Sequence, residues 1–263
     1  MNYGLTRLTP AVKFIAIALT AIFFLDKAAA ALNGHDYLLA LFALILKPYK
    51  FSPIIWAEIW RPFTYTLLHQ NLMHLLGNLI GFVFLGAALE NAIGTARFVR
   101  LYIITGIIGG LCALAAGLFG YGGDFLIGAS ACAMGVTIAF ITLFPQETIM
   151  LWLLVLIPVK ALYLGIILVI IQLASLGSAD GVSYIAHIGG MAAGFIMAKY
   201  SLYGDCFSKE WLAKQQKKAK LRRFKVVGAE ALLNNAETDT HEKTAVKPQA
   251  KPKLTIVRSS KDK

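Results

Sequence analysis

The sequence has few charged residues and few cysteines. Only 15% of its 263 residues are charged and 58% are hydrophobic, with a mean hydropathy of +0.67. Soluble domains typically carry about 25% charged residues. This composition excludes a disordered chain and an ordinary soluble enzyme, and it indicates a protein that crosses a membrane several times. The three cysteines are scattered and form no Cys-x-x-Cys pair. We therefore expect no disulfide framework, no metal and no cofactor.

Positive charge is concentrated in the C-terminal part of the chain. Residues 1–200 carry a net charge of +3 and residues 201–263 carry +8, out of +11 for the whole chain. No folded soluble part interleaves bases with aromatic residues, so nucleic acid is not an expected partner. We divide the chain into a membrane domain, 1–200, and a basic cytoplasmic tail, 201–263.

The tail itself has two parts. Residues 209–227 mix basic with apolar side chains and are expected to lie on anionic lipid as an interfacial helix. Residues 228–263 are polar and are expected to be disordered. A solvated tail without a specific partner is the alternative for the whole segment.

Six apolar segments are candidates for membrane-spanning helices, which need about 20 mostly apolar residues. They cover residues 11–31, 71–92, 98–119, 128–144, a part of 149–174, and 182–200. The sequence therefore predicts an all-α bundle of six spans with a long first outer loop at 32–70. Residues 1–30 also resemble a signal peptide, because Arg7 and Lys13 precede an apolar run that ends in three alanines. Cleavage of the first segment is the alternative.

The fifth segment contains Lys160, which would be costly at the centre of a bilayer. We therefore place the start of the fifth span near Ala161. The apolar stretch before it, 149–160, is then expected to be a loop or a segment that dips into the cytoplasmic face.

Lysine and arginine near the span ends predict the orientation. In a six-span bundle these residues fall largely on one side: Arg7, Lys13, Arg97, Arg100, Lys160 and Lys199. The short connections on the other side, 120–127 and 175–181, contain none. We expect both termini in the cytoplasm and the 32–70 loop outside, in the plasma membrane of a bacterium.

Two polar residues share one face of the second predicted span. His74 and Asn78 are one helical turn apart, and an ionisable group inside a bilayer is a candidate for function. Donors from a histidine and an asparagine suit the binding of a developing oxyanion. Hydrogen bonds that merely join helices explain the pair equally well. Gly77 and Gly81 nearby are expected to let another backbone approach.

The fourth and sixth predicted spans place a serine and a histidine at similar depth. Ser130 stands at the start of one and His187 near the start of the other, and small residues recur on both helices. These small residues are Ala131 and Gly135, and Ala186, Gly190, Gly194 and Ala198. Close packing along such stripes would bring the imidazole within hydrogen-bonding distance of the hydroxyl, which is the minimal activated nucleophile. The alternatives are an N-cap role for Ser130 and a helix-joining role for His187.

No acidic residue obviously accompanies this pair. Asp124 and Asp180 lie in predicted outer loops before Ser130 and His187, and we interpret them as loop residues. We therefore expect a serine–histidine dyad that is oriented by packing.

The motifs together resemble the rhomboid intramembrane serine proteases over roughly residues 10–200. In chain order they are Trp60-Arg61, His69, His74-Leu75-Leu76-Gly77-Asn78, Gly86-Ala87-Ala88-Leu89-Glu90, Gly128-Ala129-Ser130, and Ala186-His187 with Gly190 and Gly194. Six motifs in the order found in that family form a specific signal, although each is weak alone.

The resemblance implies a role for each motif. Ser130 would be the nucleophile, His187 the general base, and His74, Asn78 and the Ser130 N–H the oxyanion donors. Structural support would come from Trp60, Arg61, His69, Glu90, Gly128, Gly190 and Gly194. The resemblance also implies single-span membrane proteins as substrates, cut near the outer membrane face at a small residue in a locally weak helix.

Two positions depart from the family pattern. Ala131 stands where the family usually has glycine, and its methyl group would either push the fourth span away from the sixth or be tolerated. Met134 stands where an aromatic residue often backs the histidine, and a thioether packs on imidazole less rigidly. Neither change removes a reacting atom.

Two other functions compete with the protease. The first is a proteolytically inactive relative that binds membrane clients, but such relatives typically lack the serine or the histidine, and this chain has both. The second is a channel or transporter, which often shows two corresponding half-repeats. The sequence shows no such repeat.

Overall fold

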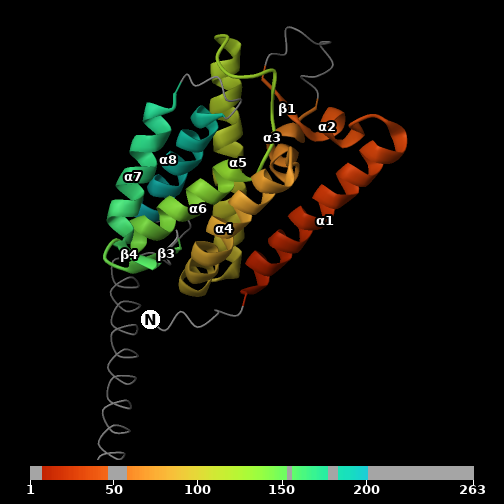
Figure 1. The fold of residues 1–263 in the computed structure, drawn as a ribbon. Coiled ribbons are helices and arrows are strands. Elements are labelled where there is room, and N and C mark those ends of the chain that lie inside the picture. The colour runs from red at the N-terminus through yellow and green to blue at the C-terminus, as the bar shows by residue number, and fades with distance from the viewer. Residues whose placement is uncertain (1–7, 47–57, 153–155, 177–182, 201–263) are drawn as a thin grey trace, which may run out of the picture. The chain divides into compact units, whose positions relative to one another are not determined.

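The computed structural model describes residues 8–46, 58–152, 156–176 and 183–200 (Figure 1). All of them belong to one unit of the chain, residues 2–212. The predicted tail, 201–263, lies outside the described residues, as do Arg7, Asp180 and the segment 47–57 of the predicted outer loop. The domain division at residue 200 therefore stays a prediction.

The described residues are mostly helical. The long helices are α1 (Pro10–Asn33), α4 (Leu72–Ile93) and α5 (Thr95–Leu118), and the shorter ones are α6 (Ser130–Leu143), α7 (Ala161–Ala174) and α8 (Tyr184–Tyr200). Two short helices, α2 (Tyr37–Phe42) and α3 (Arg61–Thr64), and a 3₁₀ turn at Tyr65–Leu67 lie between α1 and α4 in the sequence. As predicted, the fifth apolar segment becomes helical at Ala161.

Local sequence explains several helix ends. Pro10 opens α1, where its missing N–H costs no helical hydrogen bond, and Gly34 closes it in the left-handed conformation with φ 69°. The side chain of Asn71 caps α4 by accepting the N–H of His74 at 2.9 Å. These caps fix where α1 ends and where α4 begins.

Three of the described helices, α1, α4 and α5, are long and apolar enough to cross a membrane. Helices α6 and α7 have 14 residues each and α8 has 17, which is less than the roughly 20 that a full span needs. In Figure 1 successive helices run in alternating directions, so that the start of α1, the α4–α5 junction and the end of α8 lie toward the same end. This alternation agrees with the predicted order of the segments, while the six-span count and the side that faces the cytoplasm stay predictions.

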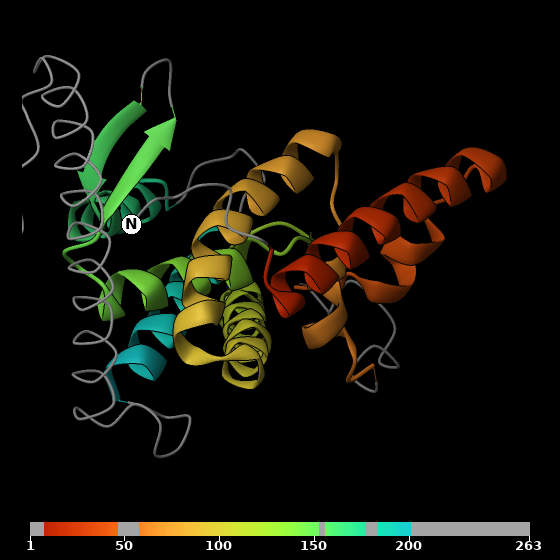
Figure 2. The ribbon, with the colours of Figure 1, turned by 90° about the horizontal axis from the view of Figure 1, so that it is seen from below.

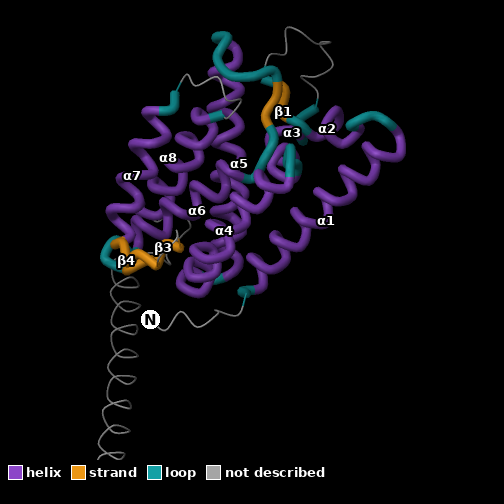
Figure 3. Tube along the Cα trace, viewed as in Figure 1, coloured by secondary structure: helices purple, strands orange, loops and turns teal. Residues whose placement is uncertain are grey.

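The expectation of a wholly helical fold needs a correction at two places. Strand β1 (Leu44–Ile45) pairs with β2 (Phe125–Leu126), and β3 (Thr148–Trp152) pairs with β4 (Leu156–Lys160), both antiparallel (Figures 2 and 3). The stretch 149–160, which we expected to be a loop or a segment that dips into the cytoplasmic face, is therefore made largely of two paired strands. Strand pairing gives the backbone groups of this apolar segment hydrogen-bond partners, which an irregular loop would leave unpaired near lipid.

Helix α6 lies at the centre of the helices and contacts α4, α5, α7 and α8. Most of its residues are buried, including Cys132, Val136 and Phe140. A helix that is apolar all round is suited to such a position. The start of this central helix carries Ser130.

The contact between α6 and α8 is as close as the small-residue stripes predict. A Cβ atom added at Gly190 would lie 2.3 Å from the carbonyl oxygen of Ala131, and one added at Gly194 would lie 2.1 Å from that of Gly135. Real Cβ atoms do not approach backbone so closely, so α6 and α8 pack backbone on backbone.

The expectation for Gly77 and Gly81 is wrong. Among the described residues, no atom lies within 4 Å of a Cβ added at either position. None of the described helices packs closely on α4 at these two glycines, whereas backbones do approach closely between α6 and α8.

Candidate active site

Ser130 is the first residue of α6 and follows a tight turn. Gly128 has φ 115°, a conformation that L side chains rarely adopt, and its N–H donates to the carbonyl of Tyr65 at 3.0 Å. The N-cap residue is Ala129, so the N-cap role considered for Ser130 is not what the structure shows. The Ser130 hydroxyl is left to interact across the bundle.

That hydroxyl meets the imidazole of His187 on α8. The distance from Ser130 Oγ to His187 Nε2 is 2.7 Å, and the histidine side is buried, with 8% of the residue exposed. The close contact between α6 and α8 one turn further on, at Gly190, explains why two residues 57 positions apart meet. A neutral imidazole at this distance can accept the hydroxyl proton.

The other ring nitrogen of His187 has a partner that the sequence analysis missed. Nδ1 lies 2.8 Å from Oε1 of Gln172 on α7, and Gln172 is 5% exposed. The expectation that packing alone orients the imidazole is therefore incomplete. The available signal was a lone amide near the end of an otherwise apolar helix, ALYLGIILVIIQLA.

An aromatic ring lies beside His187, but not from the helix we expected. The ring of Tyr184 stands edge-on to the imidazole, with centroids 6.0 Å apart and planes at 84°. Tyr184 precedes His187 by one turn on α8. Met134, which we considered for this place, packs against the main hydrophobic cluster of the bundle.

His74 and Asn78 both face the turn before Ser130. A Cβ atom added at Gly128 would lie 2.6 Å from His74 Nε2 and 3.7 Å from Asn78 Nδ2. Within the described part of the chain, Asn78 Nδ2 is buried without a hydrogen-bond partner. An unsatisfied buried donor is costly and calls for a ligand or a functional explanation. Two donor-bearing side chains of α4 thus converge on the backbone that leads into Ser130.

His69 supports the same turn from the other side. Its Nε2 accepts the N–H of Ala129 at 3.4 Å, and its ring lies edge-on to that of His74 with centroids 5.1 Å apart. Burial, with a smaller contribution from His74, lowers the pKa of His69 to about 4. The imidazole is therefore neutral at pH 7, as an acceptor nitrogen requires.

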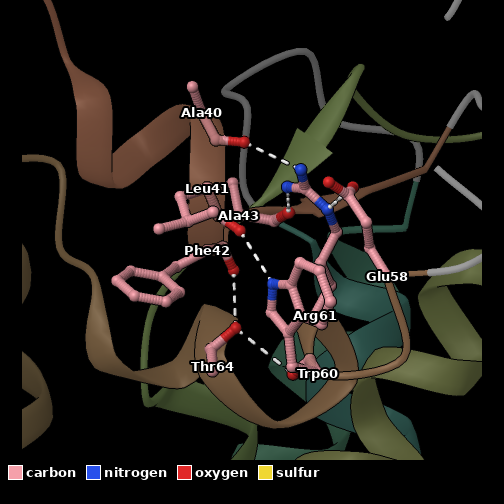
Figure 4. A network of polar contacts seen from close by, with 8 residues as sticks. All are labelled: Ala40, Leu41, Phe42, Ala43, Glu58, Trp60, Arg61 and Thr64. Carbon is pink, nitrogen blue, oxygen red and sulfur yellow. Dashed lines mark hydrogen bonds and ion pairs between the residues drawn. The ribbon is translucent and has the colours of Figure 1, made fainter. Parts of the chain in front are cut away.

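Trp60 and Arg61, at the start of α3, connect this short helix to α2 (Figure 4). The Trp60 indole N–H donates to the carbonyl of Leu41 at 3.1 Å. The Arg61 guanidinium donates to the carbonyls of Ala43 at 2.5 Å and Ala40 at 2.8 Å, and it pairs with the carboxylate of Glu58. Arg61 is buried, and these two carbonyls and this carboxylate provide the partners that a buried guanidinium needs.

Glu90 joins three helices at the end of α4. Its Oε1 accepts the Ala11 N–H at 3.0 Å and the Thr95 hydroxyl at 2.7 Å, and its Oε2 accepts the Val12 N–H at 3.0 Å. The two amides belong to the first turn of α1, where N–H groups have no partner within the helix. The carboxylate thus caps α1 from a neighbouring helix.

Several polar side chains of the described residues gather around Ser130. Among the described residues, no group of three or more His, Cys, Asp or Glu side chains could hold a metal ion. Asp124 lies in the turn before β2, where its carbonyl oxygen accepts the N–H of Leu46. The side-chain groups that the structure brings together around Ser130 are its hydroxyl, the imidazoles of His69, His74 and His187, and the amides of Asn78 and Gln172.

Known proteins share this part of the sequence. The family model of the Rhomboid domain matches residues 57–204, more than half of the chain. RHOMBOID-like protein 1 of Arabidopsis thaliana is 33% identical over 140 residues, which are 53% of this chain and 34% of the plant protein. Rhomboid protease GlpG of Salmonella newport (strain SL254) is 34% identical over 62 residues, which are 24% of this chain and 22% of that protein. The chain therefore aligns with about a third of one relative and about a fifth of the other. With more than half of its residues matched by the family model, the chain belongs to the rhomboid family.

Proposed function

We propose that this protein is an intramembrane serine endopeptidase that cleaves single-span membrane proteins. The observation that carries the proposal is the 2.7 Å contact between Ser130 Oγ and His187 Nε2 at the start of the central helix. A nucleophile within hydrogen-bonding distance of a base is the signature of covalent acyl-transfer catalysis. The named protease among the relatives supports the same reaction type.

The first chemical step follows from these positions. As Ser130 Oγ attacks the carbonyl carbon of the substrate, its proton moves to His187 Nε2. The C–N bond then breaks, and His187 returns that proton to the leaving amine. Water next attacks the acyl-enzyme, again with His187 as the base, and regenerates the serine.

The negatively charged oxygen of the tetrahedral intermediate needs hydrogen-bond donors. His74, Asn78 and the backbone N–H of Ser130 are the groups we assign to it. The buried Nδ2 of Asn78 supports this assignment, because it has no hydrogen-bond partner among the described residues and a substrate oxyanion would supply an acceptor. Gly128 supports it as well, because a Cβ atom there would lie 2.6 Å from His74 Nε2 and would displace that side chain.

The inactive alternative is not favoured. A client-binding relative needs neither a paired serine and histidine nor an unsatisfied donor beside them. This chain has both features at one place.

We place the protein in the membrane with six spans and both termini in the cytoplasm, so that Ser130 lies toward the outer face.

Cleavage of a model membrane substrate tests the proposal. Ser130→Ala and His187→Ala should each reduce cleavage to background, since in a well-studied soluble serine protease one such loss costs on the order of 10⁶ in rate. The double variant should be no worse than either single one, because the two residues act as a unit. Substantial cleavage by Ser130→Ala would end this mechanism.

The orientation has its own test. An alkaline phosphatase fused after Gly122 should be active, because that connection is placed outside, and one fused after Lys220 should be inactive. The reverse pattern would put the serine toward the wrong face of the membrane.

A further inference from the structure

Helix α7 contains a single amide side chain, and that side chain is buried. Gln172 is 5% exposed, whereas its neighbours Ile171 and Leu173 are 48% and 52% exposed. An amide buried in an apolar bundle is costly unless it forms hydrogen bonds. Its Oε1 lies 2.8 Å from His187 Nδ1, so the base of the proposed dyad is the group that satisfies it.

This contact constrains where the imidazole carries its proton. A neutral imidazole has one N–H donor and one acceptor nitrogen. When Nδ1–H donates to Oε1 of Gln172, the acceptor lone pair is on Nε2, which lies 2.7 Å from Ser130 Oγ. The other tautomer would point an N–H at the hydroxyl and leave two acceptors, Nδ1 and Oε1, facing each other.

An uncharged amide is also suited to these apolar surroundings. A carboxylate in the same place would bring a charge into a largely apolar bundle, which is costly in a membrane. The amide oxygen provides the acceptor without that charge. It stabilises the imidazolium less than a carboxylate would, but it fixes the ring in the same way.

We propose that Gln172 is a positioning residue for the Ser130–His187 pair, holding the imidazole in the tautomer and orientation that accept the serine proton. This inference rests on the proposed protease function and extends it from two residues to three. A merely structural bridge between α7 and α8 predicts something different: loss of Gln172 would lower stability but leave the turnover of the folded protein unchanged.

Gln172→Met separates these two roles in the full chain. Methionine nearly matches glutamine in length but lacks the amide oxygen. We expect kcat for a model membrane substrate to fall roughly 10- to 100-fold with KM within about twofold, because misplacement of about 1 Å can cost that much in rate. Thr105→Val is the matched control, since it also removes a buried polar group, whose hydroxyl donates to the carbonyls of Leu101 and Tyr102 on its own helix.

Gln172→Glu supplies the conservative test. The carboxylate keeps an acceptor at the same distance, so we expect kcat to remain within about threefold of wild type or above it, with a lower thermal midpoint in detergent. Gln172→Met with wild-type kcat, or with a loss of activity that only follows its loss of folded protein, would overturn the positioning role. Ser130→Ala runs in parallel, so that failure of the wild type itself to cleave would refute the protease function, whereas an active wild type and an equally active Gln172→Met would refute only the role of Gln172.

Discussion

The contact between α6 and α8 is made by backbone, whereas the contact between α1 and α4 combines apolar packing with the hydrogen bonds of one carboxylate. At Gly190 and Gly194 there is no space for even a methyl group. At the end of α4, Glu90 spans to the amides of Ala11 and Val12 by three-ångström hydrogen bonds. The close backbone packing of α6 and α8 fixes the distance between Ser130 and His187. The hydrogen bonds of Glu90 hold α1, and single substitutions can remove them one at a time.

The largest effect is therefore expected at the glycine contact. Gly194→Ala places a Cβ 2.1 Å from the carbonyl oxygen of Gly135, so α6 and α8 must separate or the protein must fail to fold. We expect cleavage to fall at least 100-fold, since a shift of about 1 Å at the pair can cost that much. Gly81→Ala is the control, because no atom of the described residues lies within 4 Å of its added Cβ.

Gly81→Ala should keep full activity and gain a little stability, because alanine favours a helix over glycine by up to about 1 kcal/mol. Cleavage assays and thermal midpoints in detergent measure both variants. Equal behaviour of the two alanine variants would contradict the distinction between a packed and an open glycine.

The oxyanion side chains should have the next largest effect. His74→Ala and Asn78→Ala each remove one donor, and such a loss costs roughly 10² to 10³ in kcat in a soluble serine protease. The thermal midpoint should change little for Asn78→Ala, because its Nδ2 has no partner within the described residues to lose. Normal turnover in both variants would return these residues to a helix-joining role.

A smaller effect is expected at the carboxylate contact. Glu90→Gln keeps one acceptor oxygen but loses the charge and one of the two bonds to the first turn of α1. Hydrogen bonds to charged groups contribute roughly 1.5–3 kcal/mol each. We expect a lower thermal midpoint with kcat within about twofold of wild type. A loss of turnover as large as that of Gly194→Ala would show that α1 also sets the geometry of Ser130.

The smallest effect is expected at Ala131. One expectation was that its methyl group pushes α6 away from α8, but the methyl group points toward α5. A Cβ added at Gly109 of α5 would lie 2.6 Å from Ala131 Cβ, whereas Gly190 of α8 faces the backbone of Ala131. Ala131→Gly should leave kcat unchanged and lower stability by about 1 kcal/mol. Faster turnover, measured as a rise in kcat of tenfold or more, would contradict this reading.

Part of this site could be predicted from sequence, for a physical reason. Small residues four apart along two helices specify where backbones approach, and Ser130 and His187 occupy matching places beside those stripes. The same reasoning failed at Gly77 and Gly81, because the sequence does not say which face of a helix another helix covers.

The rest depended on contacts between segments that are distant in the chain. Gln172 is a lone polar residue in an apolar helix, and nothing in that helix identifies His187 as its partner. The hairpin of β3 and β4 was missed because a short apolar run is compatible with a loop, a strand or a buried helix. The side chain expected beside the His187 imidazole was Met134 of α6, whereas the structure has the ring of Tyr184 from the same helix as His187.

The central claim is that Ser130 is a nucleophile activated by His187, and covalent labelling tests it most directly. A fluorophosphonate probe reacts with activated serine hydroxyls, so the wild-type protein in detergent should carry one adduct, found by peptide mass analysis at Ser130. His187→Ala should label far more slowly and Ser130→Ala not at all. Labelling of Ser130→Ala at the wild-type rate, or a wild-type adduct on another residue, would contradict the account.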